Sequence, residues 1–334
     1  MPLSKLPFQI AVISLSIILS GCSTVYNIAG RGMVSFGEQQ MMPYFMASND
    51  TEVVCAMGEG LSPAMMSFGE TVDELVPMLT LASGMCASQK AYDEKIRYLK
   101  AIRKNDGVEA QDARTMEKRY HALAAKRQYL GYQAISRAYG EPGGQCPSLN
   151  SYHEQMNWMM GLLVGMQALM ADVASEGSNN ISFDIAPKVL RGIQCLDSEK
   201  WWGVPEGVEA LALILLPSDI PAHIDPYAKL SHAVNVGNSQ GVRLVQMLEA
   251  TLYASKGNNE ALKRVIRDHV KAKKENPGDP SLRFLDEMAT QQILLLSDRL
   301  WVENTGQRTP FGKLGTFWDD AKTKSSALDI DDLI

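Results

Sequence analysis

The apolar residues of this chain recur at helical spacing almost everywhere, and no convincing alternation of apolar and polar residues indicates a strand. The clearest predicted helix runs from about Val108 to Tyr139, and Gly140 and the Glu141–Gly144 segment end it. A second helix between Ser151 and Ser175 is mostly apolar, so we expect it to be buried on most sides. Shorter helices are predicted at about 184–197, 205–216, 225–237, 241–255, 258–275 and 280–303.

The later helices are short, closely spaced and amphipathic. In the 258–275 segment, one apolar stripe is formed by Leu262, Val265, Ile266, His269 and Val270. Antiparallel helix pairs with short joints are typical of tetratricopeptide-like arrays, although no clean 34-residue consensus is present. We therefore predict an all-α fold, an irregular tetratricopeptide-like array of antiparallel helix pairs over residues 22–304. Residues 305–334 are predicted to form an irregular C-terminal tail that drapes over the domain or is partly disordered.

The first 22 residues have the layout of an export signal. Lys5 precedes an apolar run from Phe8 to Leu19, which is too short to span a bilayer. Leu19-Ser20-Gly21-Cys22 then resembles the bacterial lipobox, in which the cysteine is lipidated and the preceding peptide is removed. Residues 1–21 are thus interpreted as a lipoprotein signal peptide and Cys22 as the lipidation site; an ordinary secreted protein is the alternative. Ser23 after the cysteine resembles signals for the outer membrane, which predicts a cell-envelope protein facing the periplasm.

Composition narrows the class of protein further. Removal of residues 1–21 from the 334 leaves 313, enough for one large domain or two modest ones with a substantial core. A formal net charge of -6 gives no reason to expect nucleic acid as a partner. Apart from Cys22, an even number of cysteines in an oxidising compartment permits two disulfides. Three connectivities stay open among Cys55, Cys86, Cys146 and Cys195.

No sequence motif indicates catalysis, a metal or a cofactor. The five histidines are scattered one per predicted element, and no His-Glu-x-x-His motif or closely spaced cysteine pair occurs. Gly30-Arg31-Gly32 and Gly140–Gly144 follow no predicted strand, so both are interpreted as loops or linkers rather than phosphate cradles. No Gly-x-Ser-x-Gly elbow is present. We therefore expect a protein that is not an enzyme and that holds no cofactor.

Methionine and tryptophan supply the predicted binding residues. The chain has 18 methionines, and we weigh plain core packing first, an adaptable apolar binding surface second and Cu(I) ligation last. Gly161 and Gly165 allow a close approach of either another helix, the favoured reading, or a ligand. Trp201-Trp202 offers amphipathic rings at a cleft or a lid over the core. The predicted ligand-binding residues are Trp158, Met159, Gly161, Gly165, Met166, Trp201 and Trp202.

Several short segments together resemble one family, the TatT components of TRAP (tripartite ATP-independent periplasmic) transporters. The segments are Leu19–Cys22, Asp197–Gly203, an apolar helix ending at Leu215-Leu216-Pro217, and the Asn276–Leu282 turn before a helix with Leu294-Leu295-Leu296. Residues 30–100 fit the pattern least well. The resemblance implies a tetratricopeptide-like helical lipoprotein, a homotrimer, a groove for a small organic or apolar ligand, and contact with a periplasmic solute-binding protein.

Two functions from different classes follow. The first is a lipid-anchored periplasmic binding protein, an accessory component of a TRAP-type solute uptake system that binds a small organic or apolar ligand or a solute-binding protein. The second is a structural scaffold lipoprotein that holds an envelope assembly together and binds no ligand. A mixed-sign charge pattern between Lys95 and Arg137 indicates a solvated helix face with intrahelical pairs; an acidic partner docking there is the lesser reading.

Overall fold

The computed structural model describes residues 26–215 and 224–320, and over these residues every regular element is helical. The prediction of an all-α fold is therefore confirmed. The predicted signal peptide (residues 1–21), the predicted lipidation site Cys22 and the last part of the predicted tail, residues 321–334, lie outside the described residues. Within the described ranges, no helix combines the length and apolarity that crossing a bilayer requires.

The chain enters the fold through one long helix. Residues 26–36 are α-helical and continue through the π-helical turn η1 (Gly37–Met41) into α2 (Met42–Ala47). The interpretation of Gly30-Arg31-Gly32 as a loop or linker is therefore wrong. Gly30 is there because of packing: a Cβ atom at this position would lie 2.9 Å from Thr71 Cγ2, closer than real Cβ contacts. Gly30 therefore marks a close approach of two segments of the chain, and it does not interrupt the helix.

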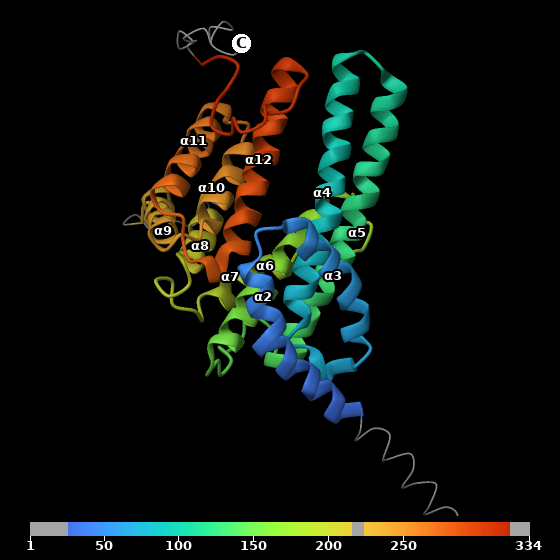
Figure 1. The fold of residues 1–334 in the computed structure, drawn as a ribbon, viewed down its shortest axis with the longest axis vertical. Helices are drawn as coiled ribbons and strands as arrows, with labels where there is room; N and C mark the ends of the chain where they lie inside the picture. Colours follow the sequence, from blue (N-terminus) through green and yellow to red (C-terminus); the bar gives the residue numbers. More distant parts are fainter. Residues whose placement is uncertain (1–25, 216–223, 321–334) are drawn as a thin grey trace, which may run out of the picture.

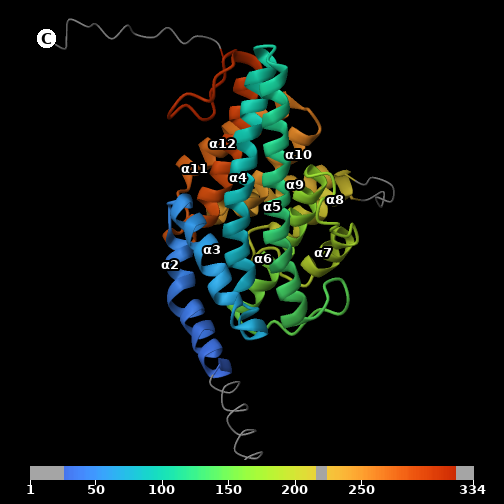
Figure 2. The same cartoon turned by 90° about the vertical axis from the view of Figure 1, so that its right-hand side faces the viewer.

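A long antiparallel hairpin forms the tallest part of the molecule (Figure 1). After α3 (Thr51–Met66) and the 3-10 turn η2 (Gly69–Val72), α4 (Val76–Arg103) and α5 (Gly107–Tyr139) pack along their length. Small buried residues let the two helices approach closely, among them Ala87, Ala91, Ala113 and Ala124. Figure 2 shows the hairpin tip at the end of the view opposite to the start of the blue N-terminal helix.

Charged side chains tie the two helices of the hairpin together near its tip. Arg97 on α4 bonds Glu109 on α5, with 2.6 Å between Nε and Oε1, and also pairs with Glu94 and with Asp112. The mixed-sign charges therefore join neighbouring helices as well as turns of one helix.

The apolar helix α6 (Tyr152–Ala174) packs against α4 and α5. Ser151 begins it with a capping box, since its hydroxyl accepts the Glu154 N–H while the Glu154 carboxylate accepts the Ser151 N–H. Residues from Met156 to Met160 are all buried, as the mostly apolar sequence of this helix predicts. The short helix α7 (Ile185–Ile193) then packs on α6.

The remaining helices form a second group. They are α8 (Val204–Leu215), α9 (Pro226–Gln240), α10 (Leu244–Ser255), α11 (Asn259–Glu275), the 3-10 turn η4 (Pro280–Leu282) and α12 (Arg283–Thr305). From α3 to α12 the helix length varies from nine residues in α7 to 33 in α5, so the array is irregular. The predicted start at 241 is three residues early, because Gly241 has a left-handed φ of 73° and ends α9 instead.

The first part of the predicted tail, up to Asp320, lies against the second helix group. Phe317 is buried with Leu262 and Ile266 in one apolar cluster, and Trp301 Nε1 donates to the Thr316 carbonyl at 3.1 Å. Lys263 Nζ lies 4.8 Å from the centroid of the Trp318 ring, a cation–π distance. The tail was predicted either to pack over the domain or to be partly disordered, and residues 306–320 pack over the domain.

Candidate functional site

A cavity of about 270 Å³ lies between the two helix groups. Its walls come from α4, α5 and α6 on one side and from α10 and α12 on the other, helices that are labelled in Figures 1 and 2. The volume is close to the lower end of the range for small-molecule sites, about 300–1,000 Å³. The apolar part of the lining is Leu81, Met85, Met170, Ala171, Met247, Leu248, Met288 and Leu295.

The apolar lining is rich in methionine, which can adapt to ligands of different shape. Four thioethers line the cavity, and each side chain has three rotatable bonds and a polarisable sulfur. They come from α4, α6, α10 and α12, so every wall except that of α5 carries one. Such a wall favours burial of apolar ligand surface at about 25 cal/mol per Å² without demanding one ligand shape.

The polar part of the lining carries no lysine, arginine, aspartate or glutamate among the described residues. Amide and hydroxyl groups take their place, and five of the nine polar residues are glutamines. The polar residues are Ser88, Gln89, Tyr92, His121, Gln128, Gln167, Thr251, Gln291 and Gln292. The cavity is therefore apolar with neutral hydrogen-bonding groups, and an ion inside it would meet no counter-charge from the lining.

Gln128 on α5 joins two helices of the lining. Its side chain is buried, and its Nε2 donates to Gln167 Oε1 at 2.9 Å, joining α5 to α6. A Cβ atom on Gly84 would overlap Gln128 Cγ, so the glycine on α4 makes room for this side chain. Gln128 Oε1 is buried and has no hydrogen-bond partner.

His121 lies two turns from Gln128 on α5, toward the hairpin tip. Burial lowers its pKa below the usual range, against the opposing effect of Glu117, so the imidazole is neutral at pH 7. Its Nε2 lies 4.0 Å from Glu117 Oε1, while its Nδ1 is buried without a partner. Gln291 Oε1 on α12 is likewise buried and unpartnered.

Hydrogen bonds from α4 hold the two sides of the cavity together. The Tyr92 hydroxyl donates to the Leu295 carbonyl on α12, and burial raises the pKa of this phenol. Further along, Arg103 Nη1 donates to the Glu303 carbonyl at 2.7 Å, and Arg308 Nη2 lies 2.6 Å from Asp93 Oδ1. The long helix α4 is thus bonded to α12 at Leu295, which lines the cavity, and at Glu303, and to the segment after α12 at Arg308.

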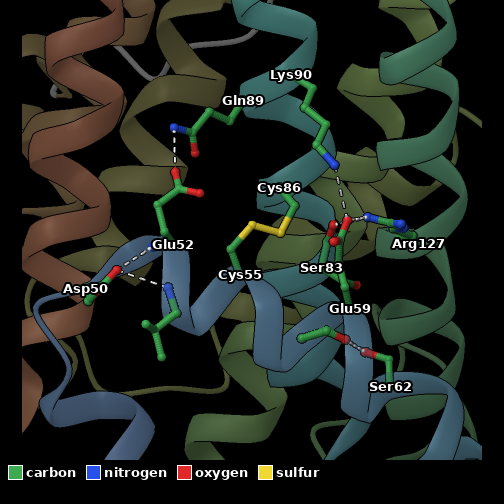
Figure 3. The surroundings of a disulfide bond; sticks show 12 residues. Asp50, Glu52, Cys55, Glu59, Ser62, Ser83, Cys86, Gln89, Lys90 and Arg127 are labelled. Atoms are coloured by element: carbon green, nitrogen blue, oxygen red, sulfur yellow. Dashed lines mark hydrogen bonds and ion pairs between the residues drawn. A yellow bond between two sulfur atoms is a disulfide. The ribbon is translucent and has the colours of Figure 1, made fainter.

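A disulfide fixes α3 to the outer face of α4 next to the cavity (Figure 3). Cys55 pairs with Cys86, with 5.4 Å between the Cα atoms. On one side of it Gln89, a lining residue, donates to Glu52 Oε1 at 3.0 Å. On the other, Arg127 Nη1 donates to Glu59 Oε1 at 2.6 Å and to the Ser83 carbonyl at 2.8 Å, as the dashed lines in Figure 3 indicate.

The second disulfide joins Cys146 to Cys195, with 5.5 Å between Cα atoms. It ties the loop after α5 to the end of α7. Of the three connectivities that the sequence left open, the structure thus has Cys55–Cys86 with Cys146–Cys195.

The seven residues predicted from sequence to bind a ligand lie elsewhere. Trp158, Met159, Trp201 and Trp202 are buried in the main apolar core, and Met166 packs partly buried against it. Trp158 Nε1 donates to the Gly192 carbonyl at 2.9 Å and Trp201 Nε1 to Gln155 Oε1 at 3.1 Å. None of the seven lines the cavity described above.

Gly161 and Gly165 serve helix packing in this structure. A Cβ atom on Gly161 would overlap Ile135 and one on Gly165 would overlap Tyr132, both on α5. This is the packing alternative that the sequence already favoured, with α5 as the partner helix.

A second, polar cavity lies beside the first helix, lined by Asn27, Arg31, Val34, Glu70, Thr71 and Glu74. Burial raises the pKa of Glu74, with further contributions from Glu38 and Glu154. Its lining mixes opposite charges and has little apolar surface, which is unlike a site for an organic molecule. Among the described residues, no three histidine, cysteine, aspartate or glutamate side chains gather in a group that could hold a metal ion.

Sequence reasoning missed most of the cavity because its residues are far apart in the chain, from Leu81 to Leu295. Met170 belongs to a methionine-rich segment, and Met247 and Leu248 belong to the apolar stripe of α10. The sequence pattern therefore marks these three lining residues as apolar positions of helices. Nothing in the sequence marks the lining glutamines as cavity residues, since glutamines on helices are usually exposed. Comparison of the chain with protein-family models, curated proteins and solved structures gave no match.

Proposed function

We propose that this chain is a lipid-anchored helical binding protein of the bacterial cell envelope, and that its cavity takes up a small, largely apolar organic molecule. The observation that carries the proposal is the methionine-lined cavity between α4–α6 and α10–α12. The Leu19–Cys22 lipobox supports the anchor and the envelope location. The proposal assigns no reaction to the protein.

The same proposal places the protein as an accessory component of a TRAP-type solute uptake system. The short segments from Asp197 to Leu296 that resemble TatT components support this placement. The irregular helical array is compatible with a tetratricopeptide-like arrangement, and a homotrimer and a solute-binding partner are parts of the proposal. Capture would work by burial, since apolar ligand surface leaves water inside the cavity.

The test is native mass spectrometry of the lipidated protein purified from membranes, followed by titration with naphthalene as an apolar probe. We expect either a co-purified small-molecule adduct or saturable naphthalene binding. Absence of both would contradict the proposal. Cross-linking in cells that recovers only envelope-assembly or cell-wall proteins would then favour the scaffold function.

A matched pair of variants locates the binding. Met170 on α6 lines the cavity and is half exposed, so a tryptophan there can fill the space without disrupting the core. Val173 on the same helix is similarly exposed but lies outside the lining. Met170→Trp is expected to weaken naphthalene binding at least tenfold, while Val173→Trp leaves it unchanged. Equal effects of the two variants would show that the probe binds elsewhere.

A further inference from the structure

The outer side of the first helix is exposed and almost uncharged. Figure 2 shows this helix in blue along one side of the molecule. From residue 26 to residue 47, thirteen residues are exposed, and Arg31 is the only charged one among them. By contrast, seven of the nine exposed residues of α11 are charged, namely Glu260, Arg264, Arg267, Asp268, Lys271, Lys274 and Glu275. Exposed helix faces are ordinarily rich in charge, so the first helix indicates contact with something other than water.

Ten of these exposed residues share the side of the helix that points away from the core. This outer face consists of Ile28, Ala29, Gly32, Ser35, Phe36, Gln39, Gln40, Pro43, Tyr44 and Ala47. Its large side chains Ile28, Phe36 and Tyr44 are each more than half exposed. Tyr44 follows Phe36 by eight residues, which in an α-helix would turn it about 80° away from Phe36. The π-helical turn η1 between them takes more residues per turn, so both rings lie on one side.

The proposed lipidation site, Cys22, is close to the beginning of this face. Tyr26, where the described helix begins, follows Cys22 by four residues, and four residues span at most about 14 Å. Acyl chains on Cys22 would therefore hold the start of the outer face at the bilayer surface. The helix from residue 26 to residue 47 is about 33 Å long, so it can stand upright on the bilayer or lie along it.

The composition of the outer face favours a helix that lies along the bilayer. An upright helix would leave Phe36 and Tyr44 in water, because Phe36 is about 15 Å along the helix from its start. A helix that lies flat buries Ile28 and Phe36 among acyl chains and places Tyr44 at the boundary with the headgroups, where tyrosine is enriched. Gln39 and Gln40 can bond headgroups without the cost of burying an ion.

We propose that the outer face of the first helix lies flat on the lipid bilayer to which Cys22 attaches the protein, so that this helix separates the core from the membrane. The inference rests on the proposed function, since it requires the lipid anchor. The outer face itself carries no charge and Arg31 lies beside it, so apolar burial and hydrogen bonds supply the attraction. The contact should therefore persist in 1 M NaCl, which screens charges beyond about 3 Å.

The test measures how deeply three positions lie in vesicles of phosphatidylethanolamine and phosphatidylglycerol that carry the lipidated protein. Ile28, Phe36 and Tyr44 are replaced by cysteine one at a time and labelled with bimane. The native cysteines of the described residues are in disulfides and do not react. An interfacial helix lies about 5–10 Å into the headgroup and acyl boundary, so brominated acyl chains should lower the fluorescence about twofold at all three positions. The matched control is Lys271→Cys on α11, an exposed position that should show no quenching.

A charge placed on the outer face should lift the helix from the bilayer. Phe36→Asp is expected to abolish the quenching of bimane at Tyr44→Cys, because a carboxylate is costly to bury in lipid. Both positions are exposed, so the fold should be kept. The matched control is Val108→Asp, an exposed apolar position in the first turn of α5 at the hairpin tip, and it should leave the quenching unchanged.

The outcomes separate this inference from the proposed function. Mass spectrometry first shows whether Cys22 carries acyl chains; if it carries none, the proposed anchor fails and this inference with it. If the protein is lipidated and only Ile28→Cys is quenched, the helix stands upright, and the anchor remains while the inference is overturned. Absence of quenching at all three positions of the lipidated protein overturns it equally. A disulfide between two molecules of Tyr44→Cys in detergent without vesicles would show that a second copy covers the face instead.

Discussion

The two sides of the cavity belong to regions that are stabilised in different ways. The disulfide-linked region (residues 51–195) contains both disulfides and closely packed glycines and alanines. The ion-paired region (residues 226–320) contains no cysteine and is built around Arg243, whose side chain is fully buried. One side of the cavity should therefore respond to reductants, and the other to loss of a charge partner and to pH.

The buried ion pair at the start of α10 should give the largest effect. Arg243 Nη1 bonds Asp286 Oδ1 at 2.8 Å, and Nη2 donates to the Ala272 carbonyl at 2.8 Å, so one guanidinium links α10, α11 and α12. Asp286→Ala leaves this cation buried without its carboxylate. We expect a loss of about 3–5 kcal/mol in the free energy of unfolding, measured with urea.

The matched control for this variant is Glu275→Ala. Glu275 pairs with Lys271 on α11, with 3.9 Å between Lys271 Nζ and Glu275 Oε1, and both side chains are mostly exposed. Pairs of this kind contribute about 0–1 kcal/mol. An Asp286→Ala loss no larger than that of the control would show that Arg243 does not hold the ion-paired region together.

The disulfides should give the next largest effect. Cys146 and Cys195 are 49 residues apart in the chain, so their bond removes substantial loop entropy from the unfolded state. Replacement of both by serine is expected to cost about 2–4 kcal/mol, measured by urea unfolding without reductant. Dithiothreitol should lower the stability of the wild type further than that of this variant. Equal stability of wild type and variant would show that this disulfide does not stabilise the disulfide-linked region, and the proposed contrast with the ion-paired region would fail.

The smallest predicted effect is a pH dependence in the ion-paired region. Burial lowers the pKa of His269 to about 3, with contributions from Arg243 and Lys273, and the ring contacts Gln246 and Thr290 at 3.0 Å each. Because the folded-state pKa lies below the unfolded value, the unfolded chain binds the proton first as pH falls. Stability is then lost below about pH 6.5, by about 1.4 kcal/mol per unit.

The variant His269→Gln isolates this effect, since glutamine can bond the same two neighbours without titrating near pH 5. Between pH 7 and pH 5 the wild type should lose about 2 kcal/mol more stability than the variant. Glu249, whose pKa burial raises to about 7, contributes with the opposite sign, because its stabilising protonated form is lost as pH rises. Both proteins share it, so it cancels in the difference. Parallel pH profiles would contradict the prediction.

Much of the fold could be predicted because local sequence decides where helices begin and end. The expected helix from Val108 to Tyr139 is α5, Gly107–Tyr139, since Asp106 caps its start and Gly140 with a φ of 94° ends it. Gly30 shows the limit of this reasoning. The same residue type that ends a helix also permits close helix packing, and only the tertiary structure distinguishes the two uses.

The cavity was beyond sequence reasoning for a different reason. The sequence predicts Trp158 and Trp201 as binding residues because large aromatic side chains often line clefts, yet such side chains also give the most burial in a core, where both lie. Gln128 and Gln291 are 163 positions apart and look like ordinary surface residues until the helices bring them to one cavity. Their chemistry is a property of burial, which a single sequence does not record.

If the chain is exported as proposed, the positions of the cysteines also set an order in which its parts can fold. All four disulfide cysteines precede residue 196, and none lies in α8–α12. A chain delivered into an oxidising compartment from its N-terminal end presents both cysteine pairs before the last five helices arrive. The wall formed by α4–α6 can then be covalently closed early, as a template on which the later helices assemble to complete the cavity.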